Sequence, residues 1–435
     1  MSFKSIPEII RNAETISHVG KIENIVGMTI EASGGKAAIG DINTIYNENT
    51  KSQVLAEVVG FKNDRVLLMP YENTDGITSG SFVRSTNQSL KIPVGDNLRG
   101  RIIDAVGKPI DGLGPIEETE YFSVNSPYIN PLARPPIREK MVFGIKALDG
   151  MITIGKGQRI GIFAGSGVGK STLLGMIAKN VKADINVIAL VGERGREVLE
   201  FVQNDLGEEG LARSVLVVAT SDQSPMLRLK CPIVATAIAE YFKNQGKDVL
   251  LMMDSLTRFA MAQREIGLAV GEPPIARGYT PSIYSELPKL LERSGNFESG
   301  SITGIYTVLV EGDDTNEPIA DTVRGILDGH IVLTRKLANA NHFPAIDVNA
   351  SISRLMNSIA PQEHLDMASK FRDLLSIYDK NEDLISIGAY KAGTNPKLDY
   401  AISKIDKINA FLKQGINEAF SYEETLAKMK EILTG

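Results

Sequence analysis

A glycine-rich segment that leads into Gly-Lys-Ser is the stretch whose residue types and spacing most directly suggest chemistry. It reads AGSGVGKST over residues 164–172, after the apolar run 160–163 and before the apolar stretch 173–179. A strand, a glycine-rich turn and a helix in this order predict a phosphate-binding loop, in which backbone N–H groups surround an oxyanion. Lys170 would neutralise the β- and γ-phosphates, and the Ser171 hydroxyl would bind Mg²⁺. We therefore expect the nucleotide to contact Gly165, Ser166, Gly167, Val168, Gly169, Lys170, Ser171 and Thr172.

The segment departs from the usual G-x-x-x-x-G-K-S pattern at its first position, which is Ala164. A small residue fits there where its φ is negative, because only a positive φ favours glycine strongly. A flexible turn with a chance Gly-Lys-Ser is the alternative, and the flanking strand and helix argue against it. ATP binding is the starting prediction.

Two acidic residues follow apolar runs that predict buried strands. Asp254 ends the run 248–254, and an acid at such a strand end beside a phosphate loop can hold Mg²⁺ through its waters. Glu193 follows the run 185–191 and would lie at the same edge of a parallel sheet. A carboxylate there could orient and deprotonate the attacking water. A surface ion pair of Glu193 with a neighbouring arginine is the alternative.

Phosphoryl transfer also needs positive charge on the transition state beyond Mg²⁺ and lysine, and an arginine finger can supply it. The residue types alone do not choose among Arg194, Arg258, Arg324 and Arg354.

The elements that must position these groups alternate strand-like and helix-like stretches over residues 141–350. This alternation predicts a parallel sheet covered on both faces. The expected strands are Ile160–Phe163, Ile185–Val191, Ser214–Val218, Val249–Met253, Ile302–Val310 and His330–Leu333.

Four parts are expected along the chain. Residues 1–20 form an amphipathic arm that either packs on the protein or binds a partner, and residues 21–90 form a small closed β-barrel. The barrel could hold a ligand, but without an aromatic platform or a basic cluster an oligomerisation collar is favoured. Residues 91–350 form the ATPase domain, beginning with a linker and an edge strand, and residues 351–435 form a helical domain. A capping box of Ser421 and Glu424 opens the last helix.

Composition narrows the class of protein. The 435 residues carry a net charge of −6, which does not suggest a nucleic-acid partner. The apolar runs are too short to span a bilayer, and the N-terminus has no secretory pattern, so we expect a cytoplasmic protein. Cys231 is the one cysteine and lies among apolar residues, which predicts a core position. The histidines lack metal-ligand spacing.

Five segments resemble a known family. They are GIFAGSGVGKST at 161–172, GERGRE at 192–197, DSLTRFAMAQRE at 254–265, GEPP with GYTPS at 271–282, and SISR at 351–354. The chain resembles the hexameric ATPases that include the catalytic subunit of the rotary ATP synthase, and within them the flagellar protein-export ATPases and their injectisome relatives. Ala164 resembles the usual residue of the export ATPases. The resemblance implies an α/β fold, with a RecA-like P-loop NTPase core, an N-terminal β-barrel and a C-terminal helical domain.

The resemblance also implies roles for individual residues. Lys170 would bind phosphate, Ser171 and Asp254 would hold Mg²⁺, and Glu193 would be the catalytic glutamate that activates water.

Three arginines and two aromatic residues complete the implied site. Arg194 and Arg258 would lie near the phosphates, and Arg354 would be a finger that reaches into a neighbour's site. Phe343 would stack on adenine. Tyr390 is a looser match to a second adenine-side ring, with a place in the helical core as its alternative.

The family also implies an assembly. A chain that carries both the glutamate and the finger can build complete sites in a homohexamer. The loop 271–279 would meet a coiled-coil stalk in the ring pore, and the N-terminal arm would bind a regulatory subunit. Export-gate components and chaperone–cargo complexes would be further partners, at the cytoplasmic face of the inner membrane.

The implied function is ATP-driven flagellar protein export. The alternatives are an injectisome ATPase, an RNA-dependent ring helicase, a rotary synthase subunit and a non-enzymatic nucleotide-binding scaffold.

Overall fold

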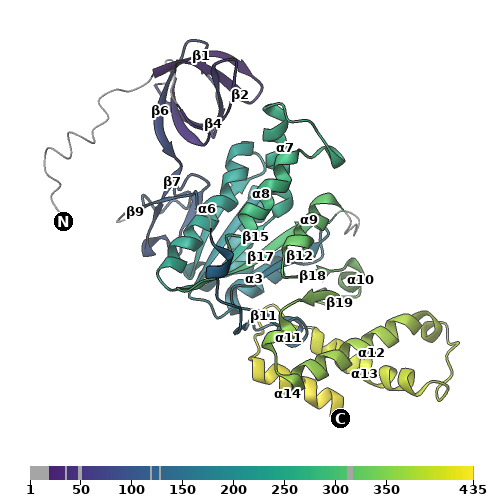
Figure 1. Cartoon of the computed structure of the whole chain (residues 1–435). Coiled ribbons are helices and arrows are strands. Elements are labelled where there is room, and N and C mark those ends of the chain that lie inside the picture. The colour runs from purple at the N-terminus through teal and green to yellow at the C-terminus, as the bar shows by residue number, and fades with distance from the viewer. Residues whose placement is uncertain are drawn as a thin grey trace.

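Three parts follow one another along the chain in the computed structural model: a β-barrel, a central α/β layer structure and a helical region (Figure 1). The structure describes residues 19–34, 37–47, 51–117, 120–126, 129–310 and 317–434. The predicted N-terminal arm falls almost wholly outside these residues. The fold class expected from the sequence is confirmed.

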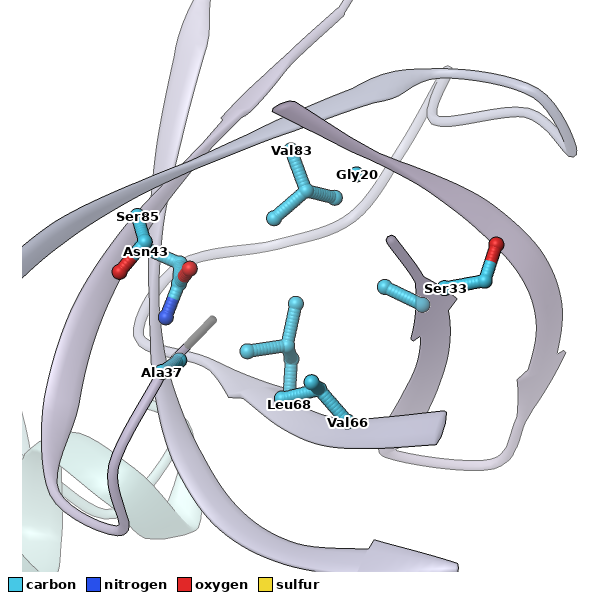
Figure 2. A pocket seen from close by; sticks show the side chains of 9 residues that line it. Gly20, Ser33, Ala37, Asn43, Val66, Leu68, Val83 and Ser85 are labelled. Carbon is cyan, nitrogen blue, oxygen red and sulfur yellow. The ribbon is translucent and has the colours of Figure 1, made fainter. Parts of the chain in front are cut away.

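The barrel closes in the strand order β1-β2-β5-β4-β3-β6. Its first two strands form a hairpin that turns at Gly27. Apolar side chains fill the interior, and Figure 2 shows the cavity between Val66, Leu68 and Val83. This cavity of about 10 Å³ holds one water at most, so the barrel interior is not a ligand pocket. The strands are β1 (Val19–Val26), β2 (Thr29–Ser33), β3 (Asp41–Tyr46), β4 (Gln53–Lys62), β5 (Arg65–Pro70) and β6 (Phe82–Ser89).

A buried ion pair joins the barrel to the central part. Lys230 Nζ lies 2.8 Å from the Glu57 carboxylate, which also accepts a hydrogen bond from the Tyr71 hydroxyl. Burial and the Glu57 charge raise the pKa of Tyr71, so the phenol stays a donor.

The central sheet has the strand order β19-β18-β12-β17-β15-β13-β14-β8, with β16 paired to β17. All the strands expected from the sequence are present, and they run parallel. β19 and β16 are antiparallel, so the sheet is mixed rather than wholly parallel. The strands are β8 (Ile102–Asp104), β12 (Arg159–Ala164), β13 (Ile185–Glu193), β14 (Ser214–Thr220), β15 (Asp248–Asp254), β16 (Gly295–Asn296), β17 (Ser301–Leu309), β18 (Gly329–Leu333) and β19 (Ile346–Ser353).

Helices cover both faces of this sheet, because alternate residues of the central strands are apolar on each side. One face packs against α6 (Pro225–Asn244), α7 (Leu256–Ala269), α8 (Pro281–Leu291) and α9 (Pro318–Ile326). Cys231 lies fully buried on this side, as predicted. The other face packs against α2 (Lys146–Met151), α3 (Lys170–Asn180) and the π-helical turn η3 (Phe201–Leu206), with α4 (Gly195–Glu200), α5 (Gly207–Ala212) and α10 (Arg335–Asn339) completing the part.

Two short pairs of strands lie outside the barrel and the central sheet. They are β7 (Lys91–Val94) with β9 (Glu120–Ser123), and β10 (Lys140–Met141) with β11 (Ile154–Gly155). Single turns of 3-10 helix lie at η1 (Asp96–Leu98), η2 (Pro131–Ala133) and η4 (Ala276–Gly278). β8 joins the end of the sheet, which confirms the edge strand expected in this region.

The C-terminal helices pack on α2 and on one another, with the Phe371 and Phe411 rings 5.5 Å apart. They begin later than residue 351, because β19 continues through Ser353. The expected capping box is confirmed: Ser421 N–H donates to Glu424 at 2.7 Å, and Glu424 N–H donates to Ser421 Oγ at 3.2 Å. The helices are α11 (Met356–Ile359), α12 (Gln362–Ser386), α13 (Pro396–Leu412) and α14 (Tyr422–Thr434).

Among the described residues, no helix is both long and apolar enough to cross a membrane.

Candidate active site

The glycine-rich loop lies between β12 and the N-terminus of α3, as its flanking residues predict. Ala164 is the last residue of β12 and pairs with Leu309 and Leu333, so its extended backbone does not require glycine. Gly167 and Gly169 have φ of +77° and +88°, which turn the loop around a space that faces solvent. The loop therefore presents backbone N–H groups at a helix N-terminus, a site that suits phosphate.

Three charged side chains meet behind this loop. The Lys170 ammonium donates a hydrogen bond to Asp254 and lies 3.8 Å from Glu193 Oε1. The Thr307 hydroxyl on β17 donates to Asp254 Oδ1 at 2.7 Å and so orients that carboxylate. Thr307 had no signal in the sequence beyond its place in an apolar strand. Glu193 ends β13 and Asp254 ends β15, so these neighbouring strands bring both predicted acids to the lysine.

A β-bulge sets the position of Glu193. Val191 pairs with Ala219 and Glu193 with Thr220, so Gly192 is an extra residue in β13. Gly192 has a φ of +67°, and a Cβ there would lie 3.1 Å from Arg258 Cβ. Glycine therefore allows both the turn at the strand end and the close approach of α7.

The electrostatics of the cluster prepare Glu193 for proton transfer. Burial, together with the charge of Asp254 and a hydrogen bond with Glu197, raises the pKa of Glu193 to about 7 against the opposing charge of Lys170. Burial alone would lower the pKa of Lys170, but the two carboxylates outweigh it and raise that pKa. A carboxylate with a pKa near neutrality is well suited to accept a proton from water.

The candidate arginines fall into different places. Arg258 lies against Gly192, and its Nε is buried with no hydrogen-bond partner among the described residues. A donor of this kind beside the phosphate loop fits an anionic oxygen. Arg194 faces solvent, with 77% of its side chain exposed, and pairs with Glu197 at 3.7 Å.

Arg354 lies at the other end of the sheet. It follows β19, and its N–H donates to the carbonyl of Asp328, just before β18 begins. The phosphate loop follows the opposite ends of these strands, and five residues of β18 span roughly 16 Å. An exposed Arg354 therefore does not reach Lys170 of its own chain. Arg324 lies close by, since its carbonyl accepts a hydrogen bond from Arg354 Nη2 at 3.3 Å.

The two aromatic candidates are separated. The Phe343 ring lies beside Gly169, within 3.4 Å of an ideal Cβ there, and 41% of the residue is exposed. Tyr390 instead bonds Asp399 at the start of α13, whereas Gln414, after the end of α13, donates to the Phe343 carbonyl. The intervening helix spans roughly 20 Å, so the structure places Tyr390 away from the Phe343 ring in this chain.

The residues around Lys170 fit a magnesium ion that keeps most of its waters. Within the described ranges, no three His, Cys, Asp or Glu residues come together as a metal cage. The exposed Ser171 hydroxyl and the buried Asp254 carboxylate are hard oxygen ligands of the kind that Mg²⁺ shares with phosphate and water. Thr172 is half-buried and hydrogen-bonds Asp205.

Comparisons with known proteins match this geometry. Residues 144–353 match the nucleotide-binding domain of the ATP synthase alpha/beta family, residues 22–87 its beta-barrel domain, and residues 360–431 the T3SS EscN ATPase C-terminal domain. The chain is 55% identical to the flagellum-specific ATP synthase of Bacillus subtilis, over 100% of this chain and 99% of that protein. The chain belongs to the ATP synthase alpha/beta family.

Solved structures refine the placement within the family. The assembled ATPase EscN of the enteropathogenic E. coli type III secretion system aligns with a TM-score of 0.90 and 48% identity, over 95% of this chain and 100% of that one. EscN in complex with its central stalk EscO aligns with a TM-score of 0.88 and 47% identity, over the same shares of the two chains. The protein is an ATP-hydrolysing enzyme of the type III export group, as the sequence resemblance predicted.

Proposed function

We propose that the protein is the motor of flagellar type III export and works as a homohexameric ring whose active sites are shared between neighbours. The observation that carries this proposal is the position of Arg354. It is exposed at one end of the sheet, while Lys170 and Glu193 lie at the other. In a ring of identical subunits, the finger of one chain completes the site of the next.

Each residue then has a defined task. The loop N–H groups and Lys170 bind the ATP phosphates, and Ser171 and Asp254 hold Mg²⁺, which neutralises phosphate charge. Glu193 accepts a proton from the attacking water, consistent with its raised pKa. Arg258 and Arg194 contribute charge at the γ-phosphate, and Arg354 of the neighbour stabilises the transition state.

Mixed rings test the shared site. Arg354→Ala rings and Lys170→Ala rings should each lose activity, because one lacks the finger and the other the phosphate lysine. In a mixture, the intact Lys170 of one subunit meets the intact Arg354 of the other, and ATP hydrolysis should partly recover. No recovery at any mixing ratio, with ring formation verified by mass, would refute a finger that acts in trans.

The loop Gly271–Tyr279 is the proposed contact with a stalk. It extends from the end of α7, away from the central sheet (Figure 1), and Ile275 is 46% exposed. Tyr279 anchors its base, because its hydroxyl bonds Glu317 at 3.2 Å. EscN has been solved with a central stalk, EscO, which supports an equivalent partner here. A regulatory subunit at the N-terminal arm, export-gate and chaperone–cargo partners, and a place at the inner membrane remain parts of this proposal.

An injectisome role is the second candidate, because EscN belongs to such a system and shares 48% identity. A chromosomal Glu193→Gln substitution in the source organism separates the two. Loss of flagellar filaments with intact effector secretion supports the flagellar role, and the reverse result supports the injectisome. RNA-stimulated ATP hydrolysis would instead indicate a ring helicase.

A further inference from the structure

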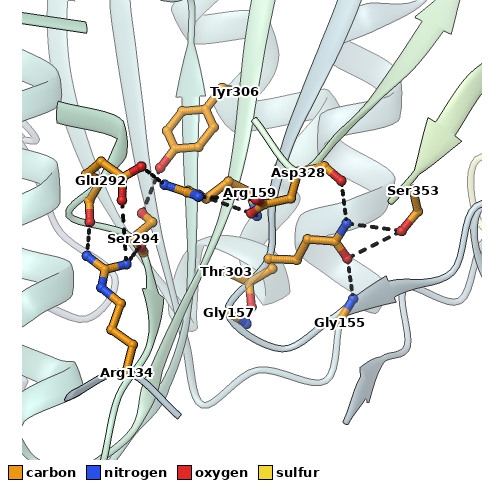
Figure 3. Close-up of polar contacts among 11 residues, drawn as sticks. Arg134, Gly155, Gly157, Arg159, Glu292, Ser294, Thr303, Tyr306, Asp328 and Ser353 are labelled. Atoms are coloured by element: carbon orange, nitrogen blue, oxygen red, sulfur yellow. Dashed lines mark hydrogen bonds and ion pairs between the residues drawn. The ribbon is translucent and has the colours of Figure 1, made fainter. Parts of the chain in front are cut away.

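A buried glutamine lies between the start of β12 and the backbone that carries Arg354. Gln158 is fully buried, and its Nε2 donates to the Asp328 carbonyl and to Ser353 Oγ, each at 3.0 Å. Its Oε1 accepts a hydrogen bond from Gly155 N–H at 2.8 Å. Figure 3 labels the three partners of this amide, Asp328, Ser353 and Gly155. The Nε2 group thus ties the start of β18 to the end of β19, while Oε1 holds Gly155 of β11.

The Asp328 carbonyl is a shared point of attachment. It accepts the Gln158 amide and also the Arg354 N–H, both at 3.0 Å. Arg354 is therefore fixed on one side by this carbonyl and on the other by Ser353, which precedes it in the chain. The finger itself projects from a backbone whose position Gln158 determines.

An ion pair also holds Asp328, through its side-chain carboxylate. The Asp328 carboxylate accepts hydrogen bonds from Arg159 N–H at 3.1 Å and from its Nε at 3.0 Å, and Arg159 also pairs with Glu292 at 2.6 Å (Figure 3). Burial opposes the charge on the guanidinium, but the two carboxylates outweigh it and raise the pKa of Arg159. Arg159 therefore stays charged, and its hydrogen bonds hold residue 328 against the start of β12.

Strand β12 connects this network to the chain's own nucleotide site. Arg159 begins the strand and Ala164 ends it, directly before the phosphate loop. The ladder to β18 is parallel over residues 161–164, so the two strands move together. Strand β12 thus leads into the phosphate loop at its C-terminal end, and at its N-terminal end it contacts the residues that hold Arg354.

We propose that Gln158 and Asp328 are positioning residues for Arg354, which hold the finger in register with the site of the neighbouring subunit. This inference rests on the proposed action of Arg354 in trans. Misplacement of a charged group by about 1 Å can cost about 100-fold in rate. Loss of the Gln158 amide should therefore lower kcat while the KM for ATP, which depends on the chain's own loop, changes much less.

The test uses full-length rings with Gln158→Leu, which keeps the side-chain bulk and removes the hydrogen bonds. We expect kcat to fall by about 10- to 100-fold and KM to change by less than about 3-fold. Mixing Gln158→Leu with Lys170→Ala should restore hydrolysis, because Lys170→Ala subunits supply well-placed fingers to the intact loops. Mixing Gln158→Leu with Arg354→Ala should restore nothing, since neither subunit then supplies a working finger.

A matched control is Asn186→Leu. Asn186 is also a fully buried amide, and it donates to a backbone carbonyl, Ala178 at 2.9 Å, and to a serine hydroxyl, Ser214 at 3.4 Å. It holds α3 and β14 and does not touch β18 or β19. Any loss of activity in this variant should not be rescued by Lys170→Ala subunits.

The outcomes separate the two proposals. If Arg354→Ala recovers with Lys170→Ala but Gln158→Leu does not, the positioning role is refuted and the shared site stands. If neither mixture recovers, the finger in trans is refuted. If Gln158→Leu does not form rings, Ser353→Ala decides, because it removes one Gln158 contact; it should show a smaller fall in kcat with the same pattern of rescue, and absence of rescue would refute the positioning role.

Discussion

Replacing Glu193 with glutamine should stabilise the nucleotide-free protein at alkaline pH while it abolishes hydrolysis. The reason lies in the charges behind the phosphate loop. Lys170 lies between Asp254 and Glu193, so one ammonium faces two largely buried carboxylates. Removing the second negative charge leaves the Lys170–Asp254 pair intact and removes an unfavourable buried carboxylate.

The size and sign follow from the Glu193 pKa. Folding raises it from 4.5 to about 7, and the side chain is only 15% exposed, so little of the effect is screened by solvent. At about 1.4 kcal/mol per pH unit, this corresponds to an upper limit of about 3 kcal/mol. Because the folded-state pKa is raised, the wild type has its full stability below pH 4.5 and loses this contribution as the pH rises through about 7. The amide in Glu193→Gln does not titrate, so this variant does not lose stability over this pH range.

The assay compares unfolding midpoints of wild type and Glu193→Gln from pH 5 to 9 without nucleotide. We expect near-equal midpoints at pH 5 and an advantage for Glu193→Gln of up to about 3 °C above pH 8. The control is Glu200→Gln on α4, whose side chain is 48% exposed and pairs with Arg196, and it should not reproduce the advantage of Glu193→Gln above pH 8. A Glu193→Gln difference that is flat across the range would refute the reasoning.

Three further results are expected. Glu193→Gln should bind a fluorescent ATP analogue with near wild-type affinity and lose hydrolysis; loss of binding would mean that Glu193 is structural. Lys230→Met should destabilise the join of barrel and core by about 3–5 kcal/mol in denaturant unfolding, because it leaves Glu57 buried without its partner. The control Lys430→Met comes from a pair whose side chains are 64% and 69% exposed, so it should leave the unfolding midpoint nearly unchanged, and a cost equal to that of Lys230→Met would contradict this. Phe343→Ala should raise the KM for ATP by about 5- to 100-fold if the ring stacks on adenine, and an unchanged KM would exclude that contact.

Local patterns in the sequence predicted what local physics determines. The phosphate loop, the strands of the central sheet and the capping box at Ser421 each depend on neighbouring residues, and the structure contains all of them. The position of Asp254 beside the phosphate loop followed from a general rule, since parallel strands present their carboxyl ends at one edge.

Features that depend on distance across the fold could not be predicted in this way. Tyr390 matched a short motif, but it lies near the start of α13, whereas Phe343 contacts the chain just after the end of α13. The length of this helix separates the two rings, and that separation depends on how the helices pack. Gln158 lies in a turn whose sequence looks unremarkable, and its role depends on Asp328 and Ser353, which are 170 and 195 residues away. Antiparallel β19 likewise continued past the expected domain boundary because its partner, β18, is set by tertiary pairing.

Strand β8 limits how the chain can be divided. It comes before residue 144, where the match to the nucleotide-binding domain begins, yet it pairs with β14 and closes one end of the central sheet. Backbone hydrogen bonds from Gly100 N–H to the Ser214 carbonyl at 2.8 Å and from Leu216 N–H to the Arg101 carbonyl at 3.1 Å hold it there. A fragment that begins at residue 144 would lack β8 and expose the backbone N–H and C=O groups of β14. Exposed edge strands of this kind pair with strands of other molecules and aggregate. A catalytic fragment that does not aggregate must therefore start before residue 100. Strand pairing, rather than sequence motifs, sets this domain boundary.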